Sequence, residues 1–154
     1  MRSIYIRRVM EFVLKNFSKV TYDRYLRVMT DYSLVIAQQV GANPEICMTA
    51  SLLHRLTENA SGPFRANKIN PVLRRCGYQA TSINKIMDCV TNLLPENQSQ
   101  RKSLEERVVA DAYLLTYWFE MTGLYDLKFE FDVSENIFHT ITLKPEMLAE
   151  DINP

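Results

Sequence analysis

The sequence lacks the features that mark membrane, secreted and nucleotide-binding proteins. No apolar run approaches the length needed to cross a bilayer. The basic N-terminus, Met1–Arg8, has no long apolar stretch and no small-residue cleavage site, so we expect a helix there and not a secretion signal. No glycine-rich phosphate loop, serine elbow or Cys-His nucleophile pattern occurs. The 18 Lys and Arg equal the 18 Asp and Glu, so the overall charge does not favour nucleic acid or an acidic membrane.

Cysteine and glycine are also scarce. The three cysteines, Cys47, Cys76 and Cys89, are odd in number and lack metal-type spacing, which favours reduced, mostly buried thiols in a cytoplasmic protein. Only four glycines occur in 154 residues, of which 47% are hydrophobic and 23% charged. These values are typical of one ordinary globular domain with a single core.

Long stretches with an apolar period of 3.6 residues predict a mainly α fold, a bundle of about six helices. Gly41 stands where a C-terminal cap belongs, Asn43 and Pro44 suit the start of a helix, and Ser103 to Glu106 fits a capping box. The pattern predicts polar loops over 58–70 and 95–102. The predicted helices run over about 3–16, 22–40, 43–57, 71–77, 80–94 and 103–121.

The apolar period changes after residue 126. Residues 128–133 and part of 137–143 alternate apolar and polar side chains, which predicts a β-hairpin within 127–154, appended to a helical bundle over 1–126. An isolated hairpin needs a surface to pack against, and the bundle or a second copy of the chain would provide one. Its apolar side chains suggest a dimer or partner surface made by Phe129, Phe131, Phe138 and Ile141.

Two titratable side chains fall on predicted apolar helix faces. His54 follows Leu53 on the inward stripe of the third helix, where a hydrogen-bonded core histidine is the common outcome. Asp111 lies between Val108 and Leu115 midway along the last helix. A carboxylate there should either find a partner or have its pKa raised by burial.

Over about residues 20–120 the chain resembles the HD-domain phosphohydrolases. Arg24–Val28 stands where that family has a histidine shortly before an Arg-Val pair, and Ala50–Leu56 stands where it has Leu-Leu-His-Asp. Between them lie a helix and the cap segment Gly41–Glu45. Glu105–Tyr113 resembles the later helix, which carries Asp-Ala-Asp. The resemblance implies a helical bundle around a metal site.

In that family two histidines and two aspartates hold one or two divalent metals, and the metal activates water against a phosphate ester. The resemblance places Arg24 at the first histidine, His54 and Arg55 at the His-Asp pair, Asp111 at the distal aspartate and Tyr113 at the second aspartate of Asp-Ala-Asp. Two of the four expected ligands are therefore retained.

The charges of the four candidate residues argue against a metal. Two neutral imidazoles, two carboxylates and one divalent cation sum to zero, whereas Arg24, His54, Arg55 and Asp111 sum to +1 with no metal. An arginine cannot lose its proton near neutrality and offers a metal no lone pair. Hard divalent ions need more ligands than one imidazole and one carboxylate. We therefore expect no metal, no cofactor and no metal-activated water.

Two arrangements of this pocket remain open. In the first and favoured one, Arg24 or Arg55 pairs with Asp111 and closes the pocket, so that the protein acts through its surface. In the second, the arginines bind a phosphate-like anion directly. Four further cations would then extend the site, although a solvated basic face is the commoner use of such residues: Arg65, Lys68, Arg74 and Arg75.

The sequence therefore predicts a catalytically inactive, HD-domain-like regulatory or binding module in the cytoplasm. Its expected partners are another protein, a second copy of the chain, or a phosphate or nucleotide ligand. The alternative is a metal-dependent phosphohydrolase with an altered ligand set, which would need ligands from outside the motifs, such as Asp23, Asp31, Glu58 or Asp88.

Overall fold

A computed structural model describes residues 3–57 and 63–122. Every regular element within these two ranges is helical, so the predicted mainly α fold is confirmed for this part of the chain. None of these helices combines the length and apolarity needed to span a bilayer. The predicted hairpin and the domain boundary at residue 126 lie outside the described residues.

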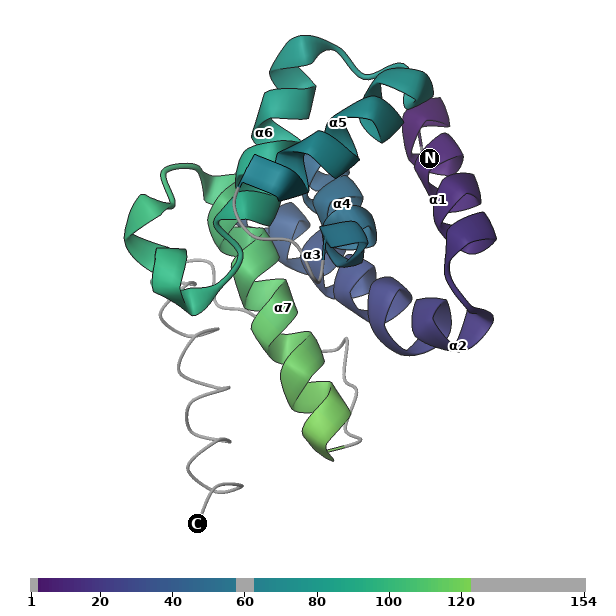
Figure 1. The fold of residues 1–154 in the computed structure, drawn as a ribbon. Helices are drawn as coiled ribbons and strands as arrows, with labels where there is room; N and C mark the ends of the chain where they lie inside the picture. Colours follow the sequence, from purple (N-terminus) through teal and green to yellow (C-terminus); the bar gives the residue numbers. More distant parts are fainter. Residues whose placement is uncertain (1–2, 58–62, 123–154) are drawn as a thin grey trace.

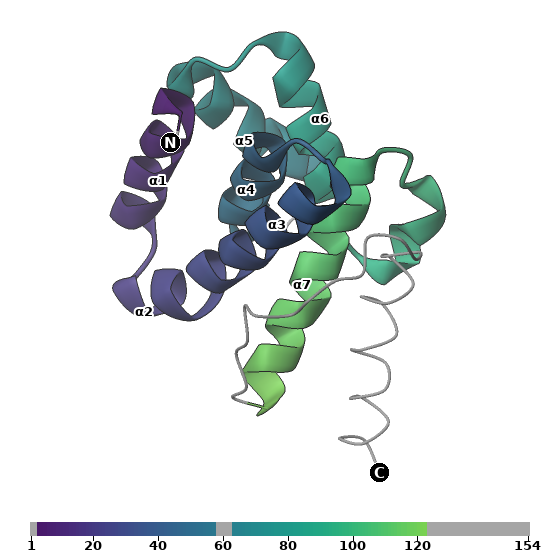
Figure 2. The same cartoon turned by 180° about the vertical axis from the view of Figure 1, so that it is seen from behind.

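The helices form one bundle with α4 at its centre (Figures 1 and 2). All of Ile46–Leu53 in α4 is buried, because α1, α3, α6 and α7 pack around this helix. In both views α1 lies on one side of α4 and α7 on the other. The α-helices are α1 (Ile4–Asn16), α2 (Lys19–Thr21), α3 (Arg27–Val40), α4 (Pro44–Leu53), α5 (Pro63–Cys76), α6 (Ala80–Thr91) and α7 (Leu104–Thr122).

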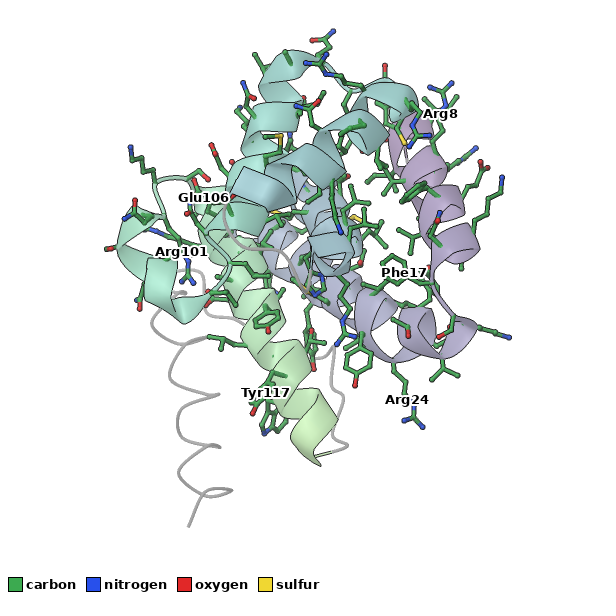
Figure 3. The ribbon with its side chains drawn as sticks, in the orientation of Figure 1. Arg8, Phe17, Arg24, Arg101, Glu106 and Tyr117 are labelled. Atoms are coloured by element: carbon green, nitrogen blue, oxygen red, sulfur yellow. The ribbon has the colours of Figure 1, made fainter. Side chains whose placement is uncertain are left out.

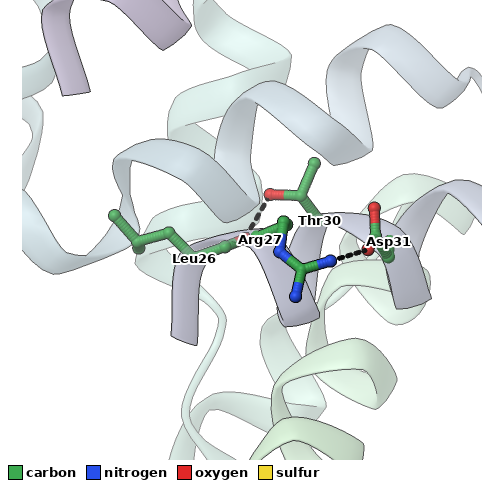
Figure 4. Close-up of polar contacts among 4 residues, drawn as sticks. All are labelled: Leu26, Arg27, Thr30 and Asp31. Carbon is green, nitrogen blue, oxygen red and sulfur yellow. Dashed lines mark hydrogen bonds and ion pairs between the residues drawn. The ribbon is translucent and has the colours of Figure 1, made fainter. Parts of the chain in front are cut away.

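Three tighter or wider turns join these helices: η1 (Tyr22–Leu26), η2 (His54–Thr57) and η3 (Pro95–Gln100). The η1 turn is a π-helix, in which the Arg27 N–H donates to the Tyr22 carbonyl five residues earlier. Just after it, the Thr30 hydroxyl donates to the Leu26 carbonyl at 2.5 Å, and Arg27 forms an ion pair with Asp31 at 3.6 Å (Figure 4). The predicted helix over 22–40 therefore starts earlier, at Lys19, and contains a wide turn.

Several predicted helix ends are confirmed by their hydrogen bonds. Asn43 accepts from the N–H groups of Glu45 and Ile46, and so caps α4. Ser103 accepts from the Glu106 N–H at 3.1 Å while the Glu106 carboxylate accepts from the Ser103 N–H at 3.2 Å, which is the reciprocal pattern of a capping box.

The three cysteines are free and buried.

The predicted polar loop over 58–70 is wrong for residues 63–70. These residues form the first part of α5, which starts at Pro63 and continues through Pro71. Ile69 and Leu73 are fully buried on this helix, so tertiary packing stabilises a helical path that Asn70-Pro71 disfavours locally. The polar segment 95–102 likewise contains the η3 turn.

Two glycines with positive φ end α3 and α5, and they differ in the space around them. A Cβ added to Gly41 (φ 79°) would meet no atom within 4 Å, whereas a Cβ added to Gly77 (φ 98°) would lie 3.1 Å from Arg8 and Tyr5. We expect Gly41→Ala to lower the free energy of unfolding by about 1 kcal/mol and Gly77→Ala by about 2 kcal/mol or more. Urea unfolding of both variants measures the difference, and equal losses would show that the contact with Arg8 and Tyr5 does not matter.

Candidate functional site

His54 stands where α4 changes into the η2 turn. Its side chain is 9% exposed. Its Nδ1 lies 2.6 Å from the Ser51 carbonyl oxygen. A carbonyl only accepts hydrogen bonds, so Nδ1 carries a proton and the tautomer is fixed by the chain's own backbone. His54 is therefore a buried histidine whose Nδ1 is hydrogen-bonded, as expected from the sequence.

A small pocket opens beside His54 between η1, η2 and α7. Its volume is about 40 Å³. The ring of Tyr113 meets the His54 ring edge-on, with centroids 5.8 Å apart. The guanidinium carbon of Arg55 lies 3.9 Å from the centre of the Tyr25 ring. The lining residues are Tyr25, Met29, His54, Arg55, Tyr113, Thr116 and Tyr117.

Asp111 is buried but does not line this pocket. Asp111 is 5% exposed. Since successive helical residues turn by about 100°, Asp111 and Tyr113 point in nearly opposite directions from α7. Tyr113 faces His54, so Asp111 faces a different side. It lies close enough to Arg101 for its charge to act on the pKa of that guanidinium, which is lowered chiefly by burial and raised by Asp111 and Glu106.

Arg24 is exposed on η1, and Figure 3 shows its side chain extending outward from the bundle. It therefore does not pair with Asp111. It stands in the π turn over Tyr22–Leu26, and its exposure there means that it does not line a pocket, as the position that the resemblance assigns to it would require. Of the four candidate residues, the structure brings together His54 and Arg55 at one pocket, and places Asp111 and Arg24 elsewhere.

Three of the four other cations considered for this site are exposed on α5. The C-terminal end of α5 adjoins α1, where Arg8 donates to the Cys76 carbonyl at 3.0 Å. Arg74 and Arg75 are exposed at that end of the helix. Lys68 is exposed as well. The side chain of Arg65 lies outside the described part.

No group of three His, Cys, Asp or Glu side chains that could hold a metal ion occurs among residues 3–57 and 63–122. Of the carboxylates considered as substitute ligands, Asp31 pairs with Arg27. Asp88 is exposed on α6, Asp23 is half-buried on η1, and Glu58 lies outside the described residues.

A buried polar network at the N-terminal end of α7 was not predicted. Glu106 is 4% exposed and accepts from the Asn92 side chain at 2.8 Å as well as from Ser103. Arg101 donates to three carbonyls at the end of α6, those of Asn92, Leu93 and Leu94, at 2.7 to 3.0 Å. Figure 3 shows Arg101 and Glu106 where η3 meets α7. The capping box was the one sequence signal for this network.

The network also shifts the titration of Asp88. Although Asp88 is exposed, partial desolvation of its carboxyl group, and next the charge of Glu106, raise its pKa, while Lys102 opposes the shift. Because the folded pKa exceeds the unfolded value, the ionised carboxylate disfavours folding. This penalty shrinks as the pH falls through the folded pKa and is gone below the unfolded pKa. We expect Asp88→Asn to raise the melting temperature at neutral pH, with an advantage that shrinks toward acid pH. Melting curves across pH test this, with Glu11→Gln as the exposed control; an advantage that grows on acidification contradicts it.

Comparisons with protein-family models, with curated proteins and with solved structures found no match to this chain.

Proposed function

We propose that this protein is a catalytically inactive binding module with the residue pattern of the HD-domain family, and that its His54–Arg55 pocket receives the phosphate group of a ligand. The observation that carries the proposal is the composition of the pocket wall. The described residues that line it include one arginine and one histidine. A guanidinium in such a place supplies the positive charge that a metal supplies in the HD-domain family.

The stacking of Arg55 on Tyr25 supports an anion site. The aromatic face holds the guanidinium over the ring at 3.9 Å, which limits its rotamers before any ligand arrives. The planar guanidinium suits the oxygens of a phosphate, and it keeps its charge at any physiological pH. A pre-positioned arginine loses less conformational entropy on binding.

The size of the pocket limits what enters it. A volume of about 40 Å³ admits one small group, whereas complete small-molecule sites enclose roughly 300–1,000 Å³. A phosphate group would therefore occupy the pocket while the rest of the ligand extends past Tyr117, whose side chain is 56% exposed at the rim. The same residue offers an aromatic ring against which a ligand ring could stack.

The test is a thermal shift titration with inorganic phosphate and with adenosine monophosphate. We expect the melting temperature to rise with ligand concentration, because a ligand at 100 times its Kd stabilises the native state by about 2.7 kcal/mol. Arg55→Gln should abolish the rise, while the matched variant Arg24→Gln, which changes an exposed arginine outside the pocket, should leave it unchanged. An equal response in both variants would place the anion elsewhere.

A metal measurement tests the alternative. Elemental analysis of protein purified without chelator, together with assays against phosphate monoesters in manganese, nickel and magnesium, separates the two functions. Stoichiometric metal with turnover that His54→Ala abolishes would establish a hydrolase and overturn the binding proposal.

A further inference from the structure

The outer surface of α1 and α2 is both apolar and basic. Among the described residues, four of the five exposed large hydrophobic side chains lie on these two helices: Ile4 (56% exposed), Tyr5 (39%), Leu14 (51%) and Val20 (62%). Tyr5 turns toward Tyr78, with ring centroids 5.3 Å apart, so Ile4, Leu14 and Val20 are the apolar side chains that a partner could cover. A concentration of exposed apolar side chains marks an interaction surface. We call this surface the α1–α2 face.

The helical period places cations among these apolar side chains. Ile4, Arg7, Glu11 and Leu14 follow one another at spacings of three and four residues, so they share the stripe of α1 opposite to its buried residues. Lys15 borders the stripe and Lys19 follows on α2, both of them exposed, while Arg8 donates to the Cys76 carbonyl at 3.0 Å. Glu11 is the one acidic residue between Ile4 and Thr21.

The sequence contains a segment with the complementary character. Residues 1–122 hold 16 Lys and Arg against 11 Asp and Glu, a net charge of +5, whereas residues 123–154 hold 2 against 7, a net charge of −5. The zero net charge of the whole chain therefore conceals two parts of opposite sign. The acidic part also alternates aromatic and acidic side chains in Phe129-Glu130-Phe131-Asp132.

We propose that residues 123–154 dock on the α1–α2 face of the same chain. The apolar side chains of the segment suit the apolar part of this surface, and its acidic side chains suit the basic part. A nucleic acid or a purely acidic ligand would match the basic side chains but not the apolar ones. The segment continues directly from α7, and the six residues between Thr122 and Phe129 can span about 23 Å when extended. A tether of this kind gives an effective concentration on the order of millimolar, so weak contacts suffice.

Paramagnetic relaxation in the full-length protein tests the contact. A nitroxide attached to Ser134→Cys is read out on the backbone amide signals of ¹⁵N-labelled protein. The three native cysteines are buried, and wild type treated with the same reagent provides the blank. At about 0.05 M salt we expect the signals of Leu14, Lys15 and Val20 to lose intensity by about twofold or more, and to recover at about 1 M salt because the ionic contacts are screened.

Matched charge reversals locate the surface. The double variant Lys15→Glu, Lys19→Glu should restore the intensities. The control Lys85→Glu, Lys102→Glu, which reverses one exposed cation on α6 and one just before α7, should not. Broadening confined to other helices, or none at low salt, overturns the proposal. A mixture of ¹⁵N-labelled, nitroxide-free protein with unlabelled, nitroxide-bearing protein identifies the donor of the segment, since broadening in this mixture would show docking from a second copy.

Discussion

Replacing Glu106 by alanine is expected to lower the free energy of unfolding by about 2–4 kcal/mol. The carboxylate is almost fully buried and accepts from the Ser103 N–H, the Ser103 hydroxyl and the Asn92 amide. Removing it leaves these donors without an acceptor in a place that water reaches poorly. It also removes a negative charge that stabilises the partly buried Arg101 guanidinium. Both effects disfavour the folded state.

Urea unfolding measures this loss, and an isosteric variant separates its two causes. Glu106→Gln keeps an oxygen that can accept from Ser103 but removes the charge, so its loss should be smaller than that of alanine. Lys102→Ala, an exposed change four residues earlier, should stay within about 0.5 kcal/mol of wild type. An alanine variant that unfolds like the lysine control would show that the network adds nothing to stability.

The same network shows where sequence reasoning reaches its limit. The capping box was predictable because Ser103 and Glu106 are three residues apart, and local hydrogen bonds follow local spacing. Asn92 and Arg101 belong to the end of α6 and to the segment before α7, and the chain must fold back before they meet Glu106. The sequence spacing of these residues does not indicate that they come into contact in the folded chain.

Some features of the candidate site could likewise be predicted from the sequence, and others could not. His54 and Arg55 are adjacent in sequence, so a pattern that places one near a pocket places both. Asp111 was correctly predicted to be buried, because its neighbours at helical spacing are apolar. Its direction was not predictable, since the apolar stripe does not reveal which buried face of α7 meets α4. The contact between Tyr113 and His54 settles that direction.

Arg24 illustrates a different cause of error. Its place at a pocket came from the resemblance to the HD-domain family alone, and in the structure it is exposed on the π turn over Tyr22–Leu26. Such a turn has no dependable sequence signature. Of the four candidate residues, the described pocket therefore contains two, His54 and Arg55, and Tyr113 lines it beside them.

Replacing Pro71 by alanine is expected to raise the free energy of unfolding by about 1–2 kcal/mol. Pro71 lies inside α5, where it offers no N–H to the carbonyl of Asn67 and its ring crowds that carbonyl. A proline inside a helix costs about 3 kcal/mol relative to alanine, and the greater freedom that alanine gives the unfolded chain returns about 1 kcal/mol of this. The side chain is exposed, so its removal leaves no cavity in the core.

The matched control is Pro44→Ala, because Pro44 occupies the first position of α4 after its Asn43 cap. At that position a proline lacks only an N–H that has no partner inside the helix, and its fixed φ suits the helix start. Alanine there should be neutral or destabilising by up to about 1 kcal/mol. Opposite signs in urea unfolding would show that residues 63–76 form one helix through Pro71, while a loss of stability in Pro71→Ala would favour a helix that begins at Pro71, as the local sequence suggests.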